Sequence, residues 1–373
     1  MKIKQFIQLL LVVFTLTLVA TLIAQQNGSI QTTMDALVKE NDLPGFNFSI
    51  IYADGTQENY SAGLADKENN LKMSIDKVMF SGSIGKTFAV ALLMQLVDEG
   101  KVDLNKKFIE YFPTLDWIKN LPNINEFTPL MLLQHSSGLP RYVYHKEVWE
   151  TTRNEPDKVW SYEDRLEYIF EDKPVNEPGK EWSYSDTGYL LIGMLVEKFY
   201  GDYYKNVNDK ILKPKQLIET FGSLTRDIPN LAVGYSDLPE FLSPKITVVD
   251  RRYYFNPQME WTGGGMASTT PDLAKWAKLY YTGNLFSDSL HQKIITPIFQ
   301  IADGMHYGAG SFIYHTEFGT AYGHTGLMPG YKSVFMYFPE EEIACALQMN
   351  CDYGVKKLSL VGYVEKILEV LKS

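Results

Sequence analysis

Residues 80–100 read FSGSIGKTFAVALLMQLVDEG, and they decide how the rest of the chain is interpreted. From Ile84 onward the apolar residues recur close to the 3.6-residue period of an α-helix, which predicts a buried helix that ends before Gly100. Ser83 and Lys86 are three residues apart at its start, so in a helical turn they share a face. A hydroxyl beside a desolvated or paired amine is a candidate activated nucleophile. The free N–H groups at a helix start add donors that stabilise negative charge on an attacked carbonyl oxygen.

The Ser-x-x-Lys spacing carries little information by itself. A second copy, Ser74-Ile75-Asp76-Lys77, precedes no long apolar helix. Ser83 also fits a simpler interpretation, in which its hydroxyl caps an ordinary core helix. Other segments of the chain must therefore separate the nucleophile from the capping residue.

Periodic segments at the two ends of the chain predict a mixed fold (α/β, α+β) around one shared sheet. Residues 46–63 predict a β-hairpin, because Asp54-Gly55 is a strong tight-turn signal between two strand-like segments. Neighbouring strands joined by tight turns imply an antiparallel sheet rather than a doubly wound one. Three further strand-like runs and an amphipathic helix follow near the C-terminus, over residues 307–315, 332–338, 343–349 and 357–371.

The middle of the chain, about residues 104–300, is rich in helical patterns and irregular connections. We find no internal repeat and no interdomain linker, so we expect a single catalytic domain over residues 27–373. Its α/β part is formed by about 27–103 and 301–373, with the helical segment inserted between them. A site is expected in the cleft between the two parts. Helical patterns cover residues 30–40, 128–134, 188–200 and 271–282.

Residues 1–26 differ from the rest of the chain. Lys2 and Lys4 precede an almost unbroken apolar run over residues 6–24, which is the pattern of a secretory signal. The run is also about long enough to span a bilayer, so an uncleaved N-terminal anchor is the competing interpretation. We expect an exported protein, periplasmic or extracellular, that meets a membrane only if this segment is retained.

Charge and motif spacing argue against several function classes. The formal net charge is −10 and there is no basic stripe, so we expect no nucleic-acid partner. The histidines show no metal-ligand spacing and no His-Glu-x-x-His motif occurs, so we expect neither a metal nor another cofactor. The turn at residues 263–265 is rich in glycine but lacks the Gly-Lys-Ser/Thr ending of a phosphate loop.

Two further motifs carry chemistry. Tyr184-Ser185-Asp186 is the only Tyr-x-Asp or Tyr-x-Asn copy that follows Pro178-Gly179 and immediately precedes an apolar helix. His324-Thr325-Gly326 occurs once and is followed by a turn and a strand.

Five short segments, in this order, resemble the serine β-lactamase and penicillin-binding protein family. The similarity covers about residues 30–350 and is strongest to the branch that holds class C β-lactamases, DD-carboxypeptidases and related esterases. It implies a β-lactamase/transpeptidase-like fold, in agreement with a sheet built from both chain ends and a helical insert. The segments are Ser-x-x-Lys at 83–86, LLQHSSGLP at 132–140, the run from Pro178-Gly179 to Tyr189, GGMAST at 264–269 and YGHTG at 322–326.

The resemblance implies a role for each matched position. Ser83 is the nucleophile that forms an acyl-enzyme, Lys86 shares its proton and orients it, and Tyr184 stands where the family has a general acid/base. Which of Lys86 and Tyr184 takes the proton stays open. The backbone N–H groups of Ser83 and Leu327 form the oxyanion hole. Thr325 helps to fix the backbone or carboxylate of the substrate.

Two residues depart from the usual family pattern. Asp186 replaces an asparagine, and an ionised carboxylate only accepts hydrogen bonds. It either pairs with Lys86 and pushes the base role toward Tyr184, or receives an ammonium group of the substrate. His324 replaces a lysine found in many members. A histidine is charged only below about pH 6.5, so we expect substrates anchored by a carboxylate to be handled worse as pH rises through that range.

These observations predict an exported serine hydrolase that works through a Ser83 acyl-enzyme. Its substrates would be small molecules or peptides, namely D-amino-acid peptides, cell-wall fragments, β-lactams or small esters. The alternative is a penicillin-binding-like receptor or structural homologue that has lost turnover, which Asp186 suggests. The fold alone does not separate these substrates, because peptidases, esterases and lactamases share it.

Overall fold

The computed structural model describes residues 29–283, 285–355 and 358–372. The predicted signal or anchor at residues 1–26 therefore lies outside the described residues. Within the described ranges, no helix combines the length and the apolar character needed to cross a bilayer.

Strands from both ends of the chain form one antiparallel sheet of nine strands. Its order is β3-β2-β1-β14-β13-β12-β11-β10-β9. β1 (Gly45–Ile51) pairs with β14 (Ile343–Met349), so the first and last strands lie side by side in the centre of the sheet. The predicted fold class is confirmed by this pairing. The other strands are β2 (Gln57–Asp66), β3 (Leu71–Lys72), β9 (Phe299–Ala302), β10 (Met305–Tyr307), β11 (Phe312–Thr316), β12 (Gly319–Met328) and β13 (Tyr331–Phe338).

The sheet differs from the predicted strands in the segment before β13. The run predicted at residues 307–315 is divided into β10 and β11 around Gly310, whose φ of 92° interrupts an extended strand. The residue pattern did not indicate β12 as a full strand, because its sequence GTAYGHTGLM holds three glycines, which weaken a strand signal. Tertiary pairing with β11 and β13 overrides that weakness.

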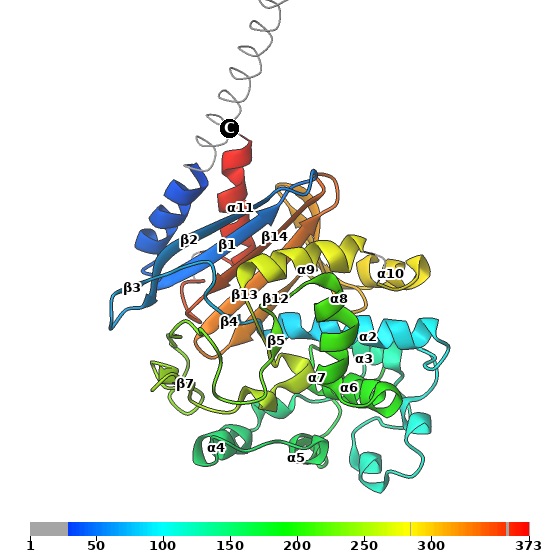
Figure 1. The fold of residues 1–373 in the computed structure, drawn as a ribbon. Coiled ribbons are helices and arrows are strands. Elements are labelled where there is room, and N and C mark those ends of the chain that lie inside the picture. The colour runs from blue at the N-terminus through cyan, green and yellow to red at the C-terminus, as the bar shows by residue number, and fades with distance from the viewer. Residues whose placement is uncertain (1–28, 284, 356–357, 373) are drawn as a thin grey trace, which may run out of the picture.

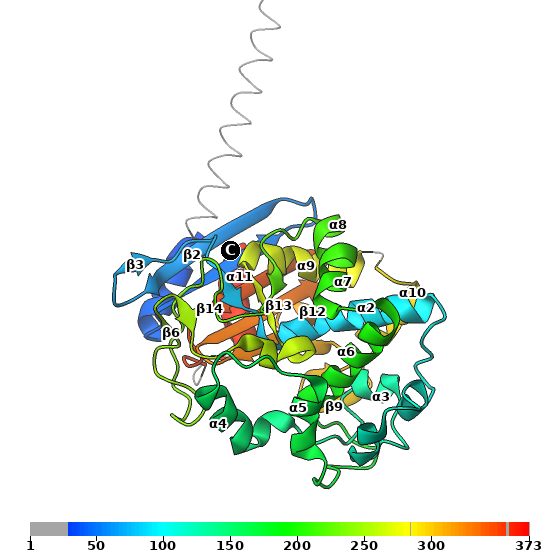
Figure 2. The same ribbon diagram turned by 60° about the horizontal axis from the view of Figure 1, so that its bottom comes forward.

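Helices cover both faces of the sheet (Figure 1). On one face lie α11 (Leu360–Leu368) and a helix that ends at residue 40, and their apolar residues share a core with β1, β13 and β14. On the other face, α9 (Thr270–Thr282) packs on β14 and β1. α2 (Lys86–Asp98) and α6 (Asp186–Tyr200) pack together in the helical region, which Figure 2 shows beneath the sheet.

The predicted helices are present with small changes at their ends. The segment at 128–134 is α3 (Pro129–Leu133), and the Thr128 hydroxyl accepts a hydrogen bond from the Met131 N–H as an N-cap. α2 ends before Gly100, whose φ is positive as expected. The other helices are α4 (Lys146–Asn154), α5 (Tyr162–Leu166), α7 (Tyr203–Val207), α8 (Lys213–Lys215) and α10 (Asp288–Ile295).

A small three-stranded sheet holds the start of α2 in place. Its order is β4-β8-β5, from β4 (Met79–Phe80), β8 (Met266–Ser268) and β5 (Phe221–Gly222). β4 leads directly into a 3₁₀ turn at Gly82–Gly85, and that turn leads into α2. Ser83 is therefore fixed between two regular elements. A two-stranded sheet of β6 (Val248–Val249) and β7 (Arg252–Tyr253) lies apart from it.

Candidate active site

The turn that carries Ser83 lies directly against β12. A Cβ atom on Gly82 would meet the Leu327 nitrogen at 2.5 Å, and one on Gly326 would meet the Ser81 carbonyl oxygen at 1.9 Å. Gly82 also has a φ of 51°, in the left-handed region that glycine tolerates best. Two glycines thus allow backbone-to-backbone contact, which brings Ser83 beside residues 325–327.

Lys86 is completely buried at the first position of α2, and its ammonium group has three acceptors. Its Nζ lies 3.0 Å from Ser83 Oγ, 2.6 Å from Asp186 Oδ1 and 2.5 Å from the Gly263 carbonyl oxygen. Burial is the largest single influence and would lower the pKa of Lys86, but the charge and hydrogen bond of Asp186, together with Tyr184 and Glu260, more than offset it and raise that pKa above its usual value. Lys86 is therefore an ammonium ion near neutral pH, and all three of its N–H donors are used.

Asp186 is held between two cations. Its Oδ1 accepts from Lys86, and its Oδ2 accepts from Arg141 Nε at 2.9 Å and from Arg141 Nη2 at 2.5 Å. Burial would raise the pKa of Asp186, yet the charges of Lys86 and Arg141 together lower it strongly. The predicted pairing with Lys86 is therefore present. The alternative, an ammonium group of the substrate on Asp186, does not fit, because the side chain is buried and both oxygens are occupied.

Sequence reasoning missed Arg141 and Glu260. Arg141 follows LLQHSSGLP without any spacing that links it to Asp186, and only the fold brings the two residues together. Glu260 precedes the glycine-rich turn, and its Oε2 lies 3.4 Å from the position of a Cβ on Gly263 or Gly264. Burial and the charge of Asp186 raise the pKa of Glu260 to about 7. A carboxylic acid next to the turn was detectable from sequence, but its burial was not.

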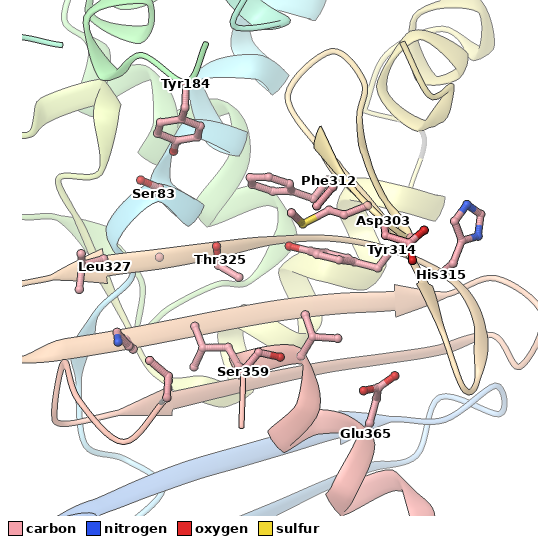
Figure 3. Close-up of a pocket in the computed structure, with 18 of the residues that line it drawn as sticks. Ser83, Tyr184, Asp303, Phe312, Tyr314, His315, Thr325, Leu327, Ser359 and Glu365 are labelled. Atoms are coloured by element: carbon pink, nitrogen blue, oxygen red, sulfur yellow. The ribbon is translucent and has the colours of Figure 1, made fainter. Parts of the chain in front are cut away.

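Tyr184 lies over Ser83. Figure 3 shows its hydroxyl directed at the Ser83 side chain. The ring centroid is 5.0 Å from Lys86 Nζ and 4.1 Å from the centroid of His135. His135 is buried and its Nδ1 accepts from the Ser185 N–H at 3.1 Å. Burial raises the pKa of Tyr184 above that of an ordinary phenol, although the charge of Lys86 opposes this.

His324 is not placed as a substrate-binding charge. Its side chain is fully buried, its Nδ1 lies 2.7 Å from the Thr325 carbonyl oxygen, and its ring packs 4.9 Å from that of Phe312. Burial, helped by the charge of Lys86, lowers the pKa of His324 to about 3. The expectation that it loses a positive charge near pH 6.5 is therefore wrong, since the imidazole is already neutral there.

An open cavity of about 700 Å³ borders Ser83. Tyr184, Thr325 and Leu327 line it, and the Leu327 side chain is 50% exposed to solvent. β11 pairs with β12 only as far as Gly323, so the segment after it has no strand partner on the side of Ser83 (Figure 3). A substrate can therefore lie along this edge of β12. Ser83, Lys86, Tyr184 and Asp186 converge at one end of the cavity, while His324 lies behind its wall.

Comparison with known proteins gives a consistent result. The family model described as Beta-lactamase matches residues 30–365. Among curated relatives, Penicillin-binding protein 4 of Amycolatopsis lactamdurans is 24% identical over 86% of this chain and 84% of its own length. A β-lactamase of Psychrobacter immobilis is 26% identical over 69% and 61%.

Solved structures share the same fold. A D-amino acid amidase from Ochrobactrum anthropi SV3 superposes with a TM-score of 0.78 at 24% identity, over 93% of this chain and 99% of that one. An octameric penicillin-binding protein homologue from Pyrococcus abyssi gives 0.73 at 26% identity, over 87% and 73%. With the family model matched along nearly the whole described chain, the protein belongs to the β-lactamase family.

Proposed function

We propose that the protein is an exported serine hydrolase that works through an acyl-enzyme on Ser83. The observation that carries this proposal is the contact set around Ser83 Oγ. Lys86 Nζ lies 3.0 Å away on one side, the Tyr184 hydroxyl is directed at it, and an open cavity gives a substrate access. A serine that only capped a helix would not need a buried lysine and a cavity-lining tyrosine beside its hydroxyl.

Tyr184 is the group that takes the serine proton. All three Lys86 protons are already donated, whereas the Tyr184 oxygen can accept once its own proton has left. Lys86 and Asp186 then act by holding Ser83 and by supplying a fixed positive charge. The raised pKa of Tyr184 means that it is a neutral phenol at rest. It must therefore lose its own proton before it can accept the proton of Ser83.

The reaction follows from these positions. Ser83 Oγ bonds to the substrate carbonyl carbon while its proton goes to the Tyr184 phenolate, and the carbonyl oxygen becomes an oxyanion. The N–H groups of Ser83 and Leu327 stabilise that oxyanion. The bond to the leaving nitrogen or oxygen then breaks, and Tyr184 returns the proton to the leaving group. A water molecule repeats the sequence on the acyl-enzyme and restores Ser83.

D-amino-acid peptides or amides and β-lactams are the substrate classes that the comparisons favour. The support is the family itself and the fold shared with a D-amino acid amidase. Small esters remain in the proposal, since an acyl-enzyme mechanism accepts any activated carbonyl that fits the cavity. Export rests on the composition of residues 1–26, and the mass of the mature protein from a secreted or periplasmic fraction tests it.

A receptor that is acylated without turnover is the second candidate. One observation favours it: Asp186 and Gly263 keep Lys86 charged and fully engaged, so the deacylating water depends on Tyr184 alone for its activation. Intact mass spectrometry separates the two candidates.

The experiment incubates the wild type and Ser83→Ala with an activated ester, a D-alanyl peptide and a β-lactam. A transient adduct on the wild type alone, followed by product, supports the hydrolase. A stable adduct without product supports the receptor. An adduct that persists in Ser83→Ala, or no adduct with any compound, contradicts both.

A further inference from the structure

The cavity beside Ser83 has a lysine on its wall that forms no ion pair with any residue that the structure describes. Lys332 is the second residue of β13, lies opposite Leu327 of β12 and lines the cavity. Directly opposed residues of an antiparallel pair point to the same face of the sheet, with Cβ atoms about 5 Å apart. Thr325 is two residues from Leu327 and shares that face. Lys332 therefore belongs to the wall against which a substrate on β12 would lie.

This lysine has no ion-pair partner in the described part of the chain. No carboxylate lies within 4.0 Å of its Nζ among the described residues. The charge of Asp352 acts on it from beyond that distance, and the Asp352 oxygens accept other bonds, Oδ1 from the Asp237 N–H at 2.7 Å and Oδ2 from the Gly330 N–H at 2.8 Å. Lys332 is half-buried, and burial lowers its pKa. An anion in the cavity would remove this cost of burial.

The charges of the cavity are arranged to direct an anion to the Lys332 end. Asp303 and Glu365 also line it, and Figure 3 shows both of them away from Leu327. Two other positive candidates lie near Ser83. Arg141 also lines the cavity, but its charge is paired with Asp186, and His324 is buried and neutral.

We propose that Lys332 determines specificity by binding a carboxylate of the substrate whose carbonyl Ser83 attacks. This inference rests on the proposed function and narrows it to substrates with a free carboxylate, such as D-amino-acid peptides with an unmodified C-terminus. The ligand is bound by a lysine on the strand next to β12, and not by the His-Thr-Gly segment.

The test measures binding without turnover. Isothermal titration calorimetry compares N-acetyl-D-alanyl-D-alanine with its C-terminal amide on the full chain carrying Ser83→Ala, alone and combined with Lys332→Met, Lys332→Arg or Lys72→Met. Lys72 is exposed on β3, so Lys72→Met controls for the loss of one positive charge. We expect the acid to bind about tenfold to a hundredfold tighter than the amide, as charge-assisted hydrogen bonds do.

Lys332→Met should abolish this preference, Lys332→Arg should keep part of it, and Lys72→Met should leave it unchanged. Thermal melts of each variant confirm that it is folded. Equal or undetectable binding of the two ligands to the Ser83→Ala protein, or the same preference with Lys332→Met, overturns the proposal. Failure of Ser83 to be acylated in the wild type is a separate result that contradicts only the proposed function.

Discussion

Two lysines lie beside the Ser83 cavity, and their surroundings differ completely. Lys86 is fully buried and donates to a serine, a carboxylate and a backbone carbonyl. Lys332 is half-buried and has no ion pair among the described residues. A buried charge whose donors are all satisfied orients its neighbours, because any change in its contacts is costly. A charge without a partner is free to meet a ligand. The contrast separates the residues that build the site from those that select what enters it.

The largest expected effect comes from removing Tyr184, which accepts the Ser83 proton because Lys86 is already protonated. Tyr184→Phe should lower kcat/KM for a neutral ester by about 10² to 10⁴-fold, the range of a general base. In the wild type, kcat/KM should rise from pH 6 to pH 9, since the pKa of Tyr184 lies above that of a normal phenol and the phenolate fraction grows with pH. The variant should lack this rise. A wild-type rate that is flat over this range would contradict Tyr184 as the base.

Asp186→Ala should have the second largest effect, because it removes the carboxylate that pairs with Lys86. It leaves two cations, Lys86 and Arg141, without their shared carboxylate. Removing one partner of a buried ion pair typically costs about 3 to 5 kcal/mol, so the free energy of unfolding in urea should fall by that amount. Asp186→Asn keeps an acceptor oxygen and should cost less. Asp116→Ala, which breaks an exposed pair with Lys119, is the control and should change nothing measurable.

Glu260 supplies a second carboxyl group near Lys86, and its effect should depend on pH. Its pKa in the folded protein is about 7, above the value of 4.5 for an unperturbed glutamic acid. Folding therefore favours the protonated acid, and its contribution to stability is complete below about pH 4.5 and is lost as pH rises through 7. Glu260→Gln imitates the protonated form.

The variant should gain stability relative to the wild type between pH 4.5 and pH 8, by up to about 3 kcal/mol for a shift of this size. Denaturation at several pH values measures this difference. Comparing the two proteins cancels the contribution of buried histidines, which stay neutral in the folded protein but take up protons in the unfolded chain below about pH 6.5 and so change stability in the opposite direction. A difference that does not vary with pH would mean that Glu260 is ionised throughout.

The smallest effect is expected at His324. Its pKa of about 3 means that it stays neutral from pH 5 to pH 8. The ratio of kcat/KM for a carboxylate-bearing substrate to that for its neutral ester should therefore stay constant over this range, because Lys332 keeps its charge there. A ratio that falls near pH 6.5 would restore His324 as the anchoring cation and remove that role from Lys332.

Most of the fold followed from local signals. The hairpin at Asp54-Gly55, the apolar helix after Ser83 and the cap at Thr128 each depend on neighbours a few residues apart. β12 did not give such a signal, because its three glycines lower strand propensity, and one of them, Gly326, allows the contact with the Ser83 turn.

The properties of the site also fall into two groups, those that local sequence indicates and those that depend on the fold. The sequence alone determined which residues have the chemistry, since Ser83, Lys86, Tyr184 and Asp186 lie in short motifs that can be recognised without a structure. It could not determine their protonation or their partners. Protonation and hydrogen-bond partners depend on burial and on charges that are distant in the sequence. Arg141, for example, pairs with Asp186, which is 45 residues away in the chain. The full engagement of Lys86, the neutrality of His324 and the place of Lys332 on the cavity wall, without an ion pair in the described ranges, became visible only in the folded chain. The reason is that desolvation and Coulomb interactions act through space and leave no pattern along the chain.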